Sequence, residues 1–151
     1  FDTSRPIFVE DEGSHIGSVQ VPSQLFSAMR AATRVFRVEV SMECRVNHLV
    51  ATYAKPGKED DILAALDRIA RRFGPERLAK SKTALNEGDF ASVARILLEY
   101  YDRRYEKHLT KGRGRSAILP VSVSTVGRGA PSATLFRALA EEIRRRTYAY
   151  A

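Results

Sequence analysis

The stretch Val35–Arg45 reads VFRVEVSMECR, and within it a strand pattern gives way to the start of a helix. Residues 35–40 alternate, so that Phe36, Val38 and Val40 share one face of a strand that is partly solvated on one side. Ser41 is a residue type that caps helices, and it predicts a helix that continues to about Tyr53. A strand that leads directly into a helix is typical of α/β proteins.

Two further β-prone runs predict strands on either side of this unit. Ile7–Glu10 is short and apolar, as expected for a buried strand, and Ala117–Val123 contains Pro120, which favours an edge or an irregular start. Strands separated by helices predict a parallel or mostly parallel sheet of about three strands. Because this number is small for a complete doubly wound domain, we expect an upstream portion of a longer protein to supply more.

Helices are predicted where apolar residues recur at helical spacing. Besides the helix that Ser41 caps, Pro22 opens one helix, a second ends at Gly74-Pro75, and a shorter third runs from Leu78 to Leu85. Asp89 caps a fourth, and a terminal helix contains Leu135, Leu139 and Ile143. The apolar face of the fourth comprises Phe90, Val93, Ala94, Leu97, Leu98 and Tyr101. We therefore divide the chain into an α/β part (1–54), a helical insertion (55–110), and a basic loop, last strand and terminal helix (111–151).

The composition indicates a folded, basic domain. The 151 residues carry a formal net charge of +7, and such a charge attracts phosphate backbones. Cys44 is the only cysteine, so an internal disulfide is excluded and a cytoplasmic setting is expected. No apolar run approaches the roughly 20 residues of a membrane-spanning helix, so no membrane association is expected. The chain starts with Phe1 and not with methionine, as a piece of a longer protein would.

Three consecutive carboxylates, Glu10, Asp11 and Glu12, end the first predicted strand. Carboxylates at a strand end can hold magnesium or orient a polar substrate, although charged residues also end strands simply because solvent begins there. The glycine-rich stretch Lys111–Ser116 lacks the spacing of a phosphate loop, and we interpret it as a solvated basic loop. Nucleotide binding by this chain alone is not expected.

Basic and aromatic side chains predict contacts with RNA, because rings stack on bases and cations neutralise phosphates. Tyr101 extends the apolar face of its helix and is expected in the core, whereas Tyr100 and Tyr105 remain candidates for contact with RNA. Cys44, with His48 one turn later, is more typical of packing than of catalysis. The candidate RNA contacts are Arg68, Arg71, Arg72, Tyr100, Arg103, Arg104, Tyr105, Lys107, Lys111, Arg113 and Arg115.

Three ordered blocks resemble the carboxy-terminal half of the tRNA 2-selenouridine synthase family. The first is Val9–Gly17, followed by Pro22 and a helix that ends in Met29-Arg30. The second is Val38–Val46, and the third is Leu97–Tyr105, which is similar to the family's Leu-Leu-x-x-Tyr-Tyr-Asp-x-x-Tyr segment. The resemblance implies the carboxy-terminal part of a phosphate-loop-type α/β fold with a large helical insertion.

The resemblance also implies an activity, in which sulfur is replaced by selenium in 2-thiouridine at the tRNA wobble position. Selenophosphate is the family's selenium donor, and an S-geranylated uridine formed from geranyl diphosphate is its intermediate. The implied partners are tRNA, an upstream rhodanese-like domain and a phosphate-loop segment of the same protein. The chain lacks both the rhodanese cysteine motif and the phosphate loop, so we expect it to be inactive alone.

By the same resemblance, Arg45 holds a diphosphate or selenophosphate, with an ion pair to Glu43 or Asp11 as the alternative. Tyr100, Tyr101, Asp102 and Tyr105 match the family's tyrosine block, which serves either packing or substrate contact. No tightly bound cofactor is implied, although magnesium is a candidate ion. Two rival functions stay open, a phosphate-loop kinase or nucleotide hydrolase and a non-catalytic basic RNA-binding module. The residues that match the acidic strand end and its turn, facing the phosphate site, are Glu10, Asp11, Glu12, Ser14 and Gly17.

Overall fold

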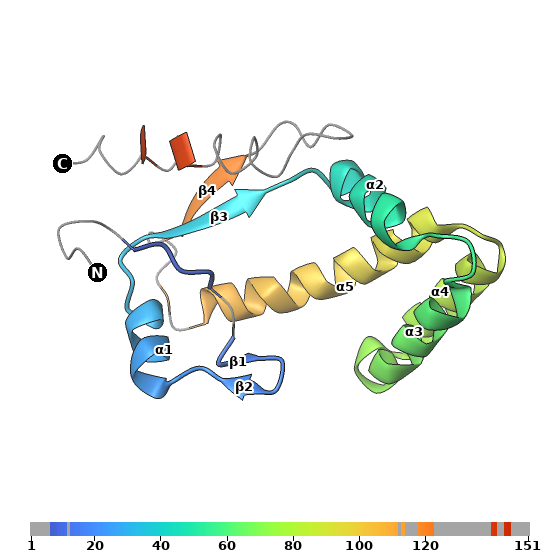
Figure 1. Ribbon diagram of the computed structural model, residues 1–151, viewed down its shortest axis with the longest axis horizontal. Coiled ribbons are helices and arrows are strands. Elements are labelled where there is room, and N and C mark those ends of the chain that lie inside the picture. Colours follow the sequence, from blue (N-terminus) through green and yellow to red (C-terminus); the bar gives the residue numbers. More distant parts are fainter. Residues whose placement is uncertain are drawn as a thin grey trace.

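The computed structural model describes residues 7–11, 13–111, 113, 118–122, 140–141 and 144–145, and it is a mixed α/β protein (Figure 1). The hairpin strands β1 and β2 come first, and β3 and β4 form a separate parallel pair. The helices lie between these strands along the chain. In chain order the elements are β1 (His15–Ile16), β2 (Val19–Gln20), α1 (Ser23–Arg30), β3 (Val35–Glu39), α2 (Met42–Tyr53), α3 (Glu59–Phe73), α4 (Pro75–Asn86), α5 (Phe90–Thr110) and β4 (Ile118–Ser122).

The parallel pair confirms two of the predicted strands and their relative direction. β3 and β4 run in register from Val35 opposite Ile118 to Glu39 opposite Ser122, although 78 residues separate the two strands. Val121 is 1% exposed, so β4 contributes one buried side chain to the interior. The chain between β3 and β4 contains α2 to α5, which places a helical body beside a short parallel sheet (Figure 1).

The predicted strand Ile7–Glu10 does not form, which is a correction to the sequence-based expectation. Its apolar side chains are exposed, and Phe8 makes a ring contact with Phe36 of β3 at a centroid distance of 6.2 Å. A strand needs a neighbour that accepts its hydrogen bonds, and an apolar run alone does not provide one. Among the described strands, β3 pairs only with β4.

The glycine-containing turn after the carboxylates belongs to a small hairpin that the sequence analysis did not predict. His15 lies opposite Gln20 and Ile16 opposite Val19, which leaves Gly17 and Ser18 as the two loop residues. Gly17 has φ of 61°, and a glycine at the first central position is typical of a type II′ turn. The hairpin precedes α1, whose amino-terminal cap is Pro22.

The helical body was predicted well because its caps are local. The Ser41 hydroxyl accepts a hydrogen bond from the Cys44 amide at 3.3 Å, and the Asp89 carboxylate accepts one from the Ser92 amide at 3.0 Å. Helix α4 begins at Pro75, earlier than predicted, because proline is tolerated in the first turn. The buried core cluster lies among α3, α4 and α5 and comprises Leu66, Phe73, Ala84, Leu85, Val93 and Tyr100.

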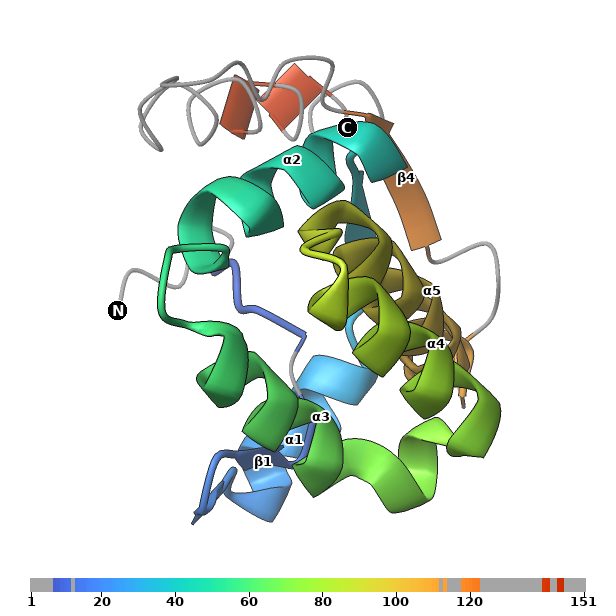
Figure 2. The same cartoon turned by 90° about the vertical axis from the view of Figure 1, so that its right-hand side faces the viewer.

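Figure 2 looks along the molecule, with α2 at the top and α3 at the lower left, opposite α4 and α5. Ion pairs join α5 to two other elements, since Arg95 pairs with Glu43 of α2 at 2.7 Å and Glu106 pairs with Arg37 of β3 at 3.2 Å. No helix in the described part of the chain is long and apolar enough to cross a membrane. The predicted terminal helix falls largely outside the described residues; 140–141 and 144–145 are helical.

Candidate functional site

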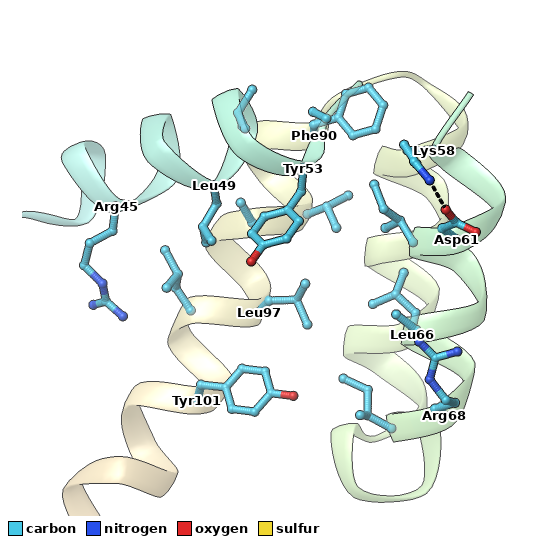
Figure 3. Close-up of a pocket in the computed structure, with 18 of the residues that line it drawn as sticks. Arg45, Leu49, Tyr53, Lys58, Asp61, Leu66, Arg68, Phe90, Leu97 and Tyr101 are labelled. Carbon is cyan, nitrogen blue, oxygen red and sulfur yellow. Dashed lines mark hydrogen bonds and ion pairs between the residues drawn. The ribbon is translucent and has the colours of Figure 1, made fainter. Parts of the chain in front are cut away.

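Helices α2, α3 and α5 enclose a hollow of about 850 Å³, which we call the apolar groove (Figure 3). Its walls are predominantly hydrocarbon, because each of the three helices turns aliphatic and aromatic side chains toward the others. Three tyrosines, Tyr53, Tyr101 and Tyr105, add hydroxyl groups to these walls without adding charge. The side chains that define the groove in the following argument are Leu49 and Tyr53 of α2, Ala65 and Ile69 of α3, and Leu97 and Tyr101 of α5.

Cationic side chains line the groove beside these apolar walls. Lys58 donates a hydrogen bond to Asp61 at 2.7 Å, which raises the pKa of the Lys58 ammonium and lowers the pKa of the Asp61 carboxyl. Arg68 lies at the end of the groove away from Phe90, and Arg45 lies at the α2 wall (Figure 3). The groove therefore combines an apolar interior with positive charge at its margins.

Arg45 is fixed by a carboxylate that the sequence analysis did not consider as its partner. It lies in the first turns of α2, where the Ser41 cap sets the direction of the helix. Its two terminal nitrogens donate to the Asp102 carboxylate oxygens at 2.9 and 2.6 Å, and these hydrogen bonds raise the pKa of Arg45. The predicted alternative partners are wrong, because Glu43 pairs with Arg95, and Asp11 pairs with other arginines.

Asp11 joins three chain segments and does not face the apolar groove. Its carboxylate accepts a hydrogen bond from Arg113 at 2.7 Å and lies 3.8 Å from Arg30. Arg30 also donates to the main-chain oxygen of Lys111. The Arg113 side chain is only 2% exposed, so it holds Asp11 in the interior and does not reach a large ligand. We call Asp11, Arg30 and Arg113 the arginine clamp.

The arginine clamp and Arg45 lie on different sides of the parallel pair. Arg30 and Arg113 each precede the start of a strand, β3 and β4 respectively, whereas Arg45 follows the end of β3. The two parallel strands begin at the same end of the sheet. The clamp therefore lies at the amino ends of the strands, and Arg45 lies at their carboxyl ends. The predicted acidic site and the predicted phosphate arginine are therefore not brought together.

The other members of the predicted acidic site are dispersed. Glu10 is exposed, Ser14 makes a hydrogen bond with the adjacent His15 at 3.1 Å, and Gly17 lies in the exposed hairpin turn. Glu12 lies outside the described residues. Across the described ranges no group of three or more histidine, cysteine or acidic residues could hold a metal ion.

In the tyrosine block, the burial of Tyr100 and Tyr101 is the reverse of what was predicted. Tyr100 is 8% exposed and makes an edge-to-face contact with Phe73 at 5.1 Å, so it packs in the core and is not open to RNA. Tyr101 is 39% exposed and lines the groove. The physical reason is that α5 packs against α2 and also against α4, so a single apolar stripe does not describe it.

The remaining candidate RNA contacts are mostly at the surface. Tyr105 is 61% exposed, and Arg104 lies over the Tyr100 ring with its guanidinium 5.7 Å from the centroid. Arg113 is withdrawn from the surface by the clamp, and Arg115 lies outside the described residues. The exposed members on α3, on α5 and just beyond it are Arg68, Arg71, Arg72, Arg103, Arg104, Tyr105, Lys107 and Lys111.

A second hollow, of about 390 Å³, adjoins the first and is lined by Arg68, Ile69, Arg71 and Arg72. We call it the arginine depression. Arg68 and Ile69 line both hollows, so the two adjoin along α3. Neither hollow was predicted from sequence, and the only available signal was the spacing of arginines beside apolar residues within one helix.

Comparison with known proteins identifies the family. The family model described as the tRNA 2-selenouridine synthase AAA domain matches residues 2–125. The chain is 30% identical to the tRNA 2-selenouridine synthase of Marinobacter nauticus, over 72% of this chain and 37% of that protein. It is 33% identical to the protein of the same name from Pseudomonas syringae pv. tomato, over 64% of this chain and 34% of that protein.

The chain thus spans little more than a third of the length of the curated relatives it matches. No solved structure matches it significantly. The matched residues include α1 to α5, both hollows and the parallel pair, so the family assignment covers the whole candidate site. The resemblance drawn from the three sequence blocks is confirmed. The chain belongs to the family of tRNA 2-selenouridine synthase AAA domains.

Proposed function

We propose that this chain is part of a cytoplasmic tRNA-modifying transferase that converts wobble 2-thiouridine to 2-selenouridine through an S-geranylated intermediate. Selenophosphate would donate the selenium. The single observation that carries the geranyl step is the apolar groove, because tRNA and selenophosphate are polar and have no need of hydrocarbon walls. An isoprenoid chain does have that need.

The size and lining of the groove suit such a chain. A volume of about 850 Å³ lies within the range of roughly 300–1,000 Å³ that ligand sites occupy. Removing an aliphatic carbon from water contributes about 0.8 kcal/mol, so a ten-carbon chain supplies substantial binding energy. Tyr53 and Tyr101 line the hollow, and the face of an aromatic ring stabilises positive charge like that which develops on an allylic carbon.

The chemistry consists of two substitutions. In the first, the sulfur of 2-thiouridine attacks C1 of geranyl diphosphate, the C1–O bond breaks, diphosphate leaves with the electron pair, and the base loses its N3 proton. In the second, the selenium of selenophosphate attacks C2 of the base, and the C2–S bond breaks to release the geranyl thiolate, which takes a proton from water. Hydrolysis of the Se–P bond then releases phosphate and leaves 2-selenouridine.

The residues of this chain would bind and orient the reactants. The apolar groove holds the geranyl chain and keeps water from it, and Arg45 adds a fixed cation at the wall where an anionic reactant enters. Exposed cations and Tyr105 on the carboxy-terminal half of α5 offer a surface for tRNA phosphates and bases. No step is assigned to a magnesium ion.

The test fills the groove without altering its charge. In the full-length protein, Ala65→Trp places an indole in the groove, and Ala64→Trp is the matched control because Ala64 is the adjacent, exposed residue of α3. Wobble nucleosides from cells that carry each variant are measured by mass spectrometry. We expect Ala65→Trp to abolish geranylated and selenium-containing uridine, with Ala64→Trp normal. A folded Ala65→Trp protein with normal levels of both nucleosides would remove the groove from the reaction.

A rival function as a non-catalytic RNA-binding module has one observation in its favour, the exposed basic side chains of α5. Mass spectrometry of wobble nucleosides from a strain that lacks the gene separates the two functions. For an RNA-binding module, deletion of the gene leaves the wobble nucleosides unchanged, whereas the transferase is required for 2-selenouridine.

A further inference from the structure

The apolar groove and the arginine depression are adjoining hollows with different chemical linings. They share Arg68 and Ile69, so the depression lies next to the Arg68 end of the groove. The groove is predominantly hydrocarbon, and three of the four side chains that line the depression are arginines. A hollow of this kind is complementary to an amphiphile with an apolar chain and an anionic head.

The three arginines lie on one face of α3. Their positions are i, i+3 and i+4, which places neighbouring side chains on the same side of a helix. All three are exposed, and Arg71 and Arg72 lie in the last turn, where the helix dipole favours cations. This arrangement concentrates positive charge at the carboxy-terminal end of α3.

Nearby carboxylates do not neutralise this charge. Asp67 of α3 pairs with Lys82 of α4 at 2.8 Å. Asp61 accepts a hydrogen bond from Lys58, and Arg68 makes only a lesser contribution to lowering its pKa. Within the described part of the chain, Arg71 and Arg72 take part in no ion pair. Their guanidinium groups can therefore donate to a ligand.

We propose that Arg68, Arg71 and Arg72 form the head-group subsite for an isoprenoid diphosphate whose chain lies in the apolar groove. The proposal rests on the proposed function, since it takes the geranyl donor as the occupant of the groove. Guanidinium forks match phosphate oxygens, and a diphosphate offers enough oxygens to engage more than one fork. The chain then extends from Arg68 toward Phe90, the opposite end of the groove in Figure 3.

This orientation gives the arginines a role in the transfer. The reacting C1 is bonded to the head group, so it lies at the junction of the two hollows, next to Ile69. When the C1–O bond breaks, the diphosphate takes the electron pair and gains negative charge. The arginines stabilise that charge as it develops. They are assigned to the geranyl donor and not to the tRNA backbone, because tRNA phosphates carry no apolar chain to occupy the adjoining groove.

The experiment measures binding by titration calorimetry with full-length protein and three probes: geranyl diphosphate, inorganic diphosphate and tRNA. The test variant is Arg71→Gln with Arg72→Gln. The control is Lys55→Gln with Lys80→Gln, which removes the same charge from exposed positions that line neither hollow. A third variant, Ala65→Trp, fills the groove and leaves the arginines in place.

We expect the arginine variant to bind both diphosphates about tenfold or more weakly than the lysine control does. The two variants should have equal effects on the affinity for tRNA. Ala65→Trp should lower the affinity for geranyl diphosphate and leave the affinity for inorganic diphosphate unchanged. If the arginine variant lowers tRNA affinity more than the control and leaves geranyl diphosphate unchanged, the arginines contact RNA and the proposal is overturned. If the wild-type protein binds no geranyl diphosphate, the proposed geranyl step fails as well.

Discussion

Arg45 and Asp102 form a two-pronged ion pair that joins α2 to α5 across 57 residues of sequence, with donor–acceptor distances of 2.9 and 2.6 Å. Both hydrogen bonds use terminal nitrogens, so the guanidinium plane is fixed relative to α5. Because Arg45 also lines the apolar groove, Asp102 sets the position of a positive charge at the groove wall. This pair links a residue of the second resembling block to a residue of the third.

Removal of Arg45 should affect the reaction more than the fold. The pair is about a third exposed on both sides, and exposed pairs contribute about 1 kcal/mol or less. We therefore expect Arg45→Ala to lower the free energy of unfolding by no more than about 1 kcal/mol, as measured by urea denaturation, and to reduce selenouridine strongly. Asp102→Asn should have an intermediate effect, since it keeps the shape but loses the charge. Normal selenouridine in Arg45→Ala would show that this cation is dispensable.

The two tyrosines Tyr100 and Tyr105 should respond oppositely to substitution. Tyr100→Ala removes a ring packed on Phe73 and should cost about 3 kcal/mol of unfolding free energy, whereas Tyr100→Phe should cost less than about 1 kcal/mol. Tyr105→Ala should leave stability unchanged and weaken tRNA binding, because the ring is exposed. Thermal denaturation and a tRNA binding titration provide both measurements. Weaker tRNA binding by a stable Tyr100→Phe protein would contradict this division.

The arginine clamp predicts a structural role for Asp11. Asp11→Asn leaves Arg113 buried without its ion-pair partner and should lower the free energy of unfolding by up to about 3 kcal/mol. Glu10→Gln is the matched control, since Glu10 is the exposed neighbour and should have no measurable effect. Hydrogen exchange of the amides near residues 7–11 and 30 should accelerate only in Asp11→Asn. Equal exchange in the two variants would indicate that the clamp does not hold this segment.

The Asp89 cap predicts a pH-dependent contribution to stability. Hydrogen bonds from the Ser92 hydroxyl and amide lower the pKa of Asp89 below its usual value. A lowered folded-state pKa gives stability that is present above the unfolded pKa of about 3.9 and is lost as the pH falls through the folded value. We compare melting temperatures of the wild type and Asp89→Asn at pH 7 and pH 3. The melting temperature of the wild type should fall more between pH 7 and pH 3 than that of the variant, because asparagine accepts the same hydrogen bond at both pH values.

Salt dependence tests the basic surface of α5. If Arg103 and Arg104 contact tRNA phosphates, Arg103→Gln with Arg104→Gln should weaken tRNA binding and reduce the slope of log affinity against log salt by about one for each lost contact. Lys80→Gln, on exposed α4, serves as the control and should leave the slope unchanged. An unchanged slope in the arginine variant would place the tRNA surface elsewhere.

Much of the fold was accessible from sequence because its signals are local. Ser41 and Asp89 cap their helices through hydrogen bonds to residues three positions ahead, so four residues are enough to predict each start. The strand at 35–39 was visible from its alternation, although its pairing partner lies more than 70 residues away. Ile7–Glu10 was wrongly predicted because an apolar run indicates burial or β propensity but not the presence of a hydrogen-bonding neighbour.

The candidate site was less accessible, because side-chain partners are chosen in three dimensions. Arg45 was identified from its block, but its partner Asp102 was not, since sequence proximity favoured Glu43. Tyr100 and Tyr101 are adjacent, and only the packing of two helical layers around α5 decides which ring is buried.

The sequence by itself determined the family, the capped helices and the basic charge, because these depend on residue type and on spacing within a few turns. Only the tertiary structure decided that Asp11 binds buried arginine and that α2, α3 and α5 enclose the apolar groove. It also decided that the groove adjoins the arginine depression. Each of these depends on the distance between residues far apart in the chain, which burial and packing fix and local spacing does not.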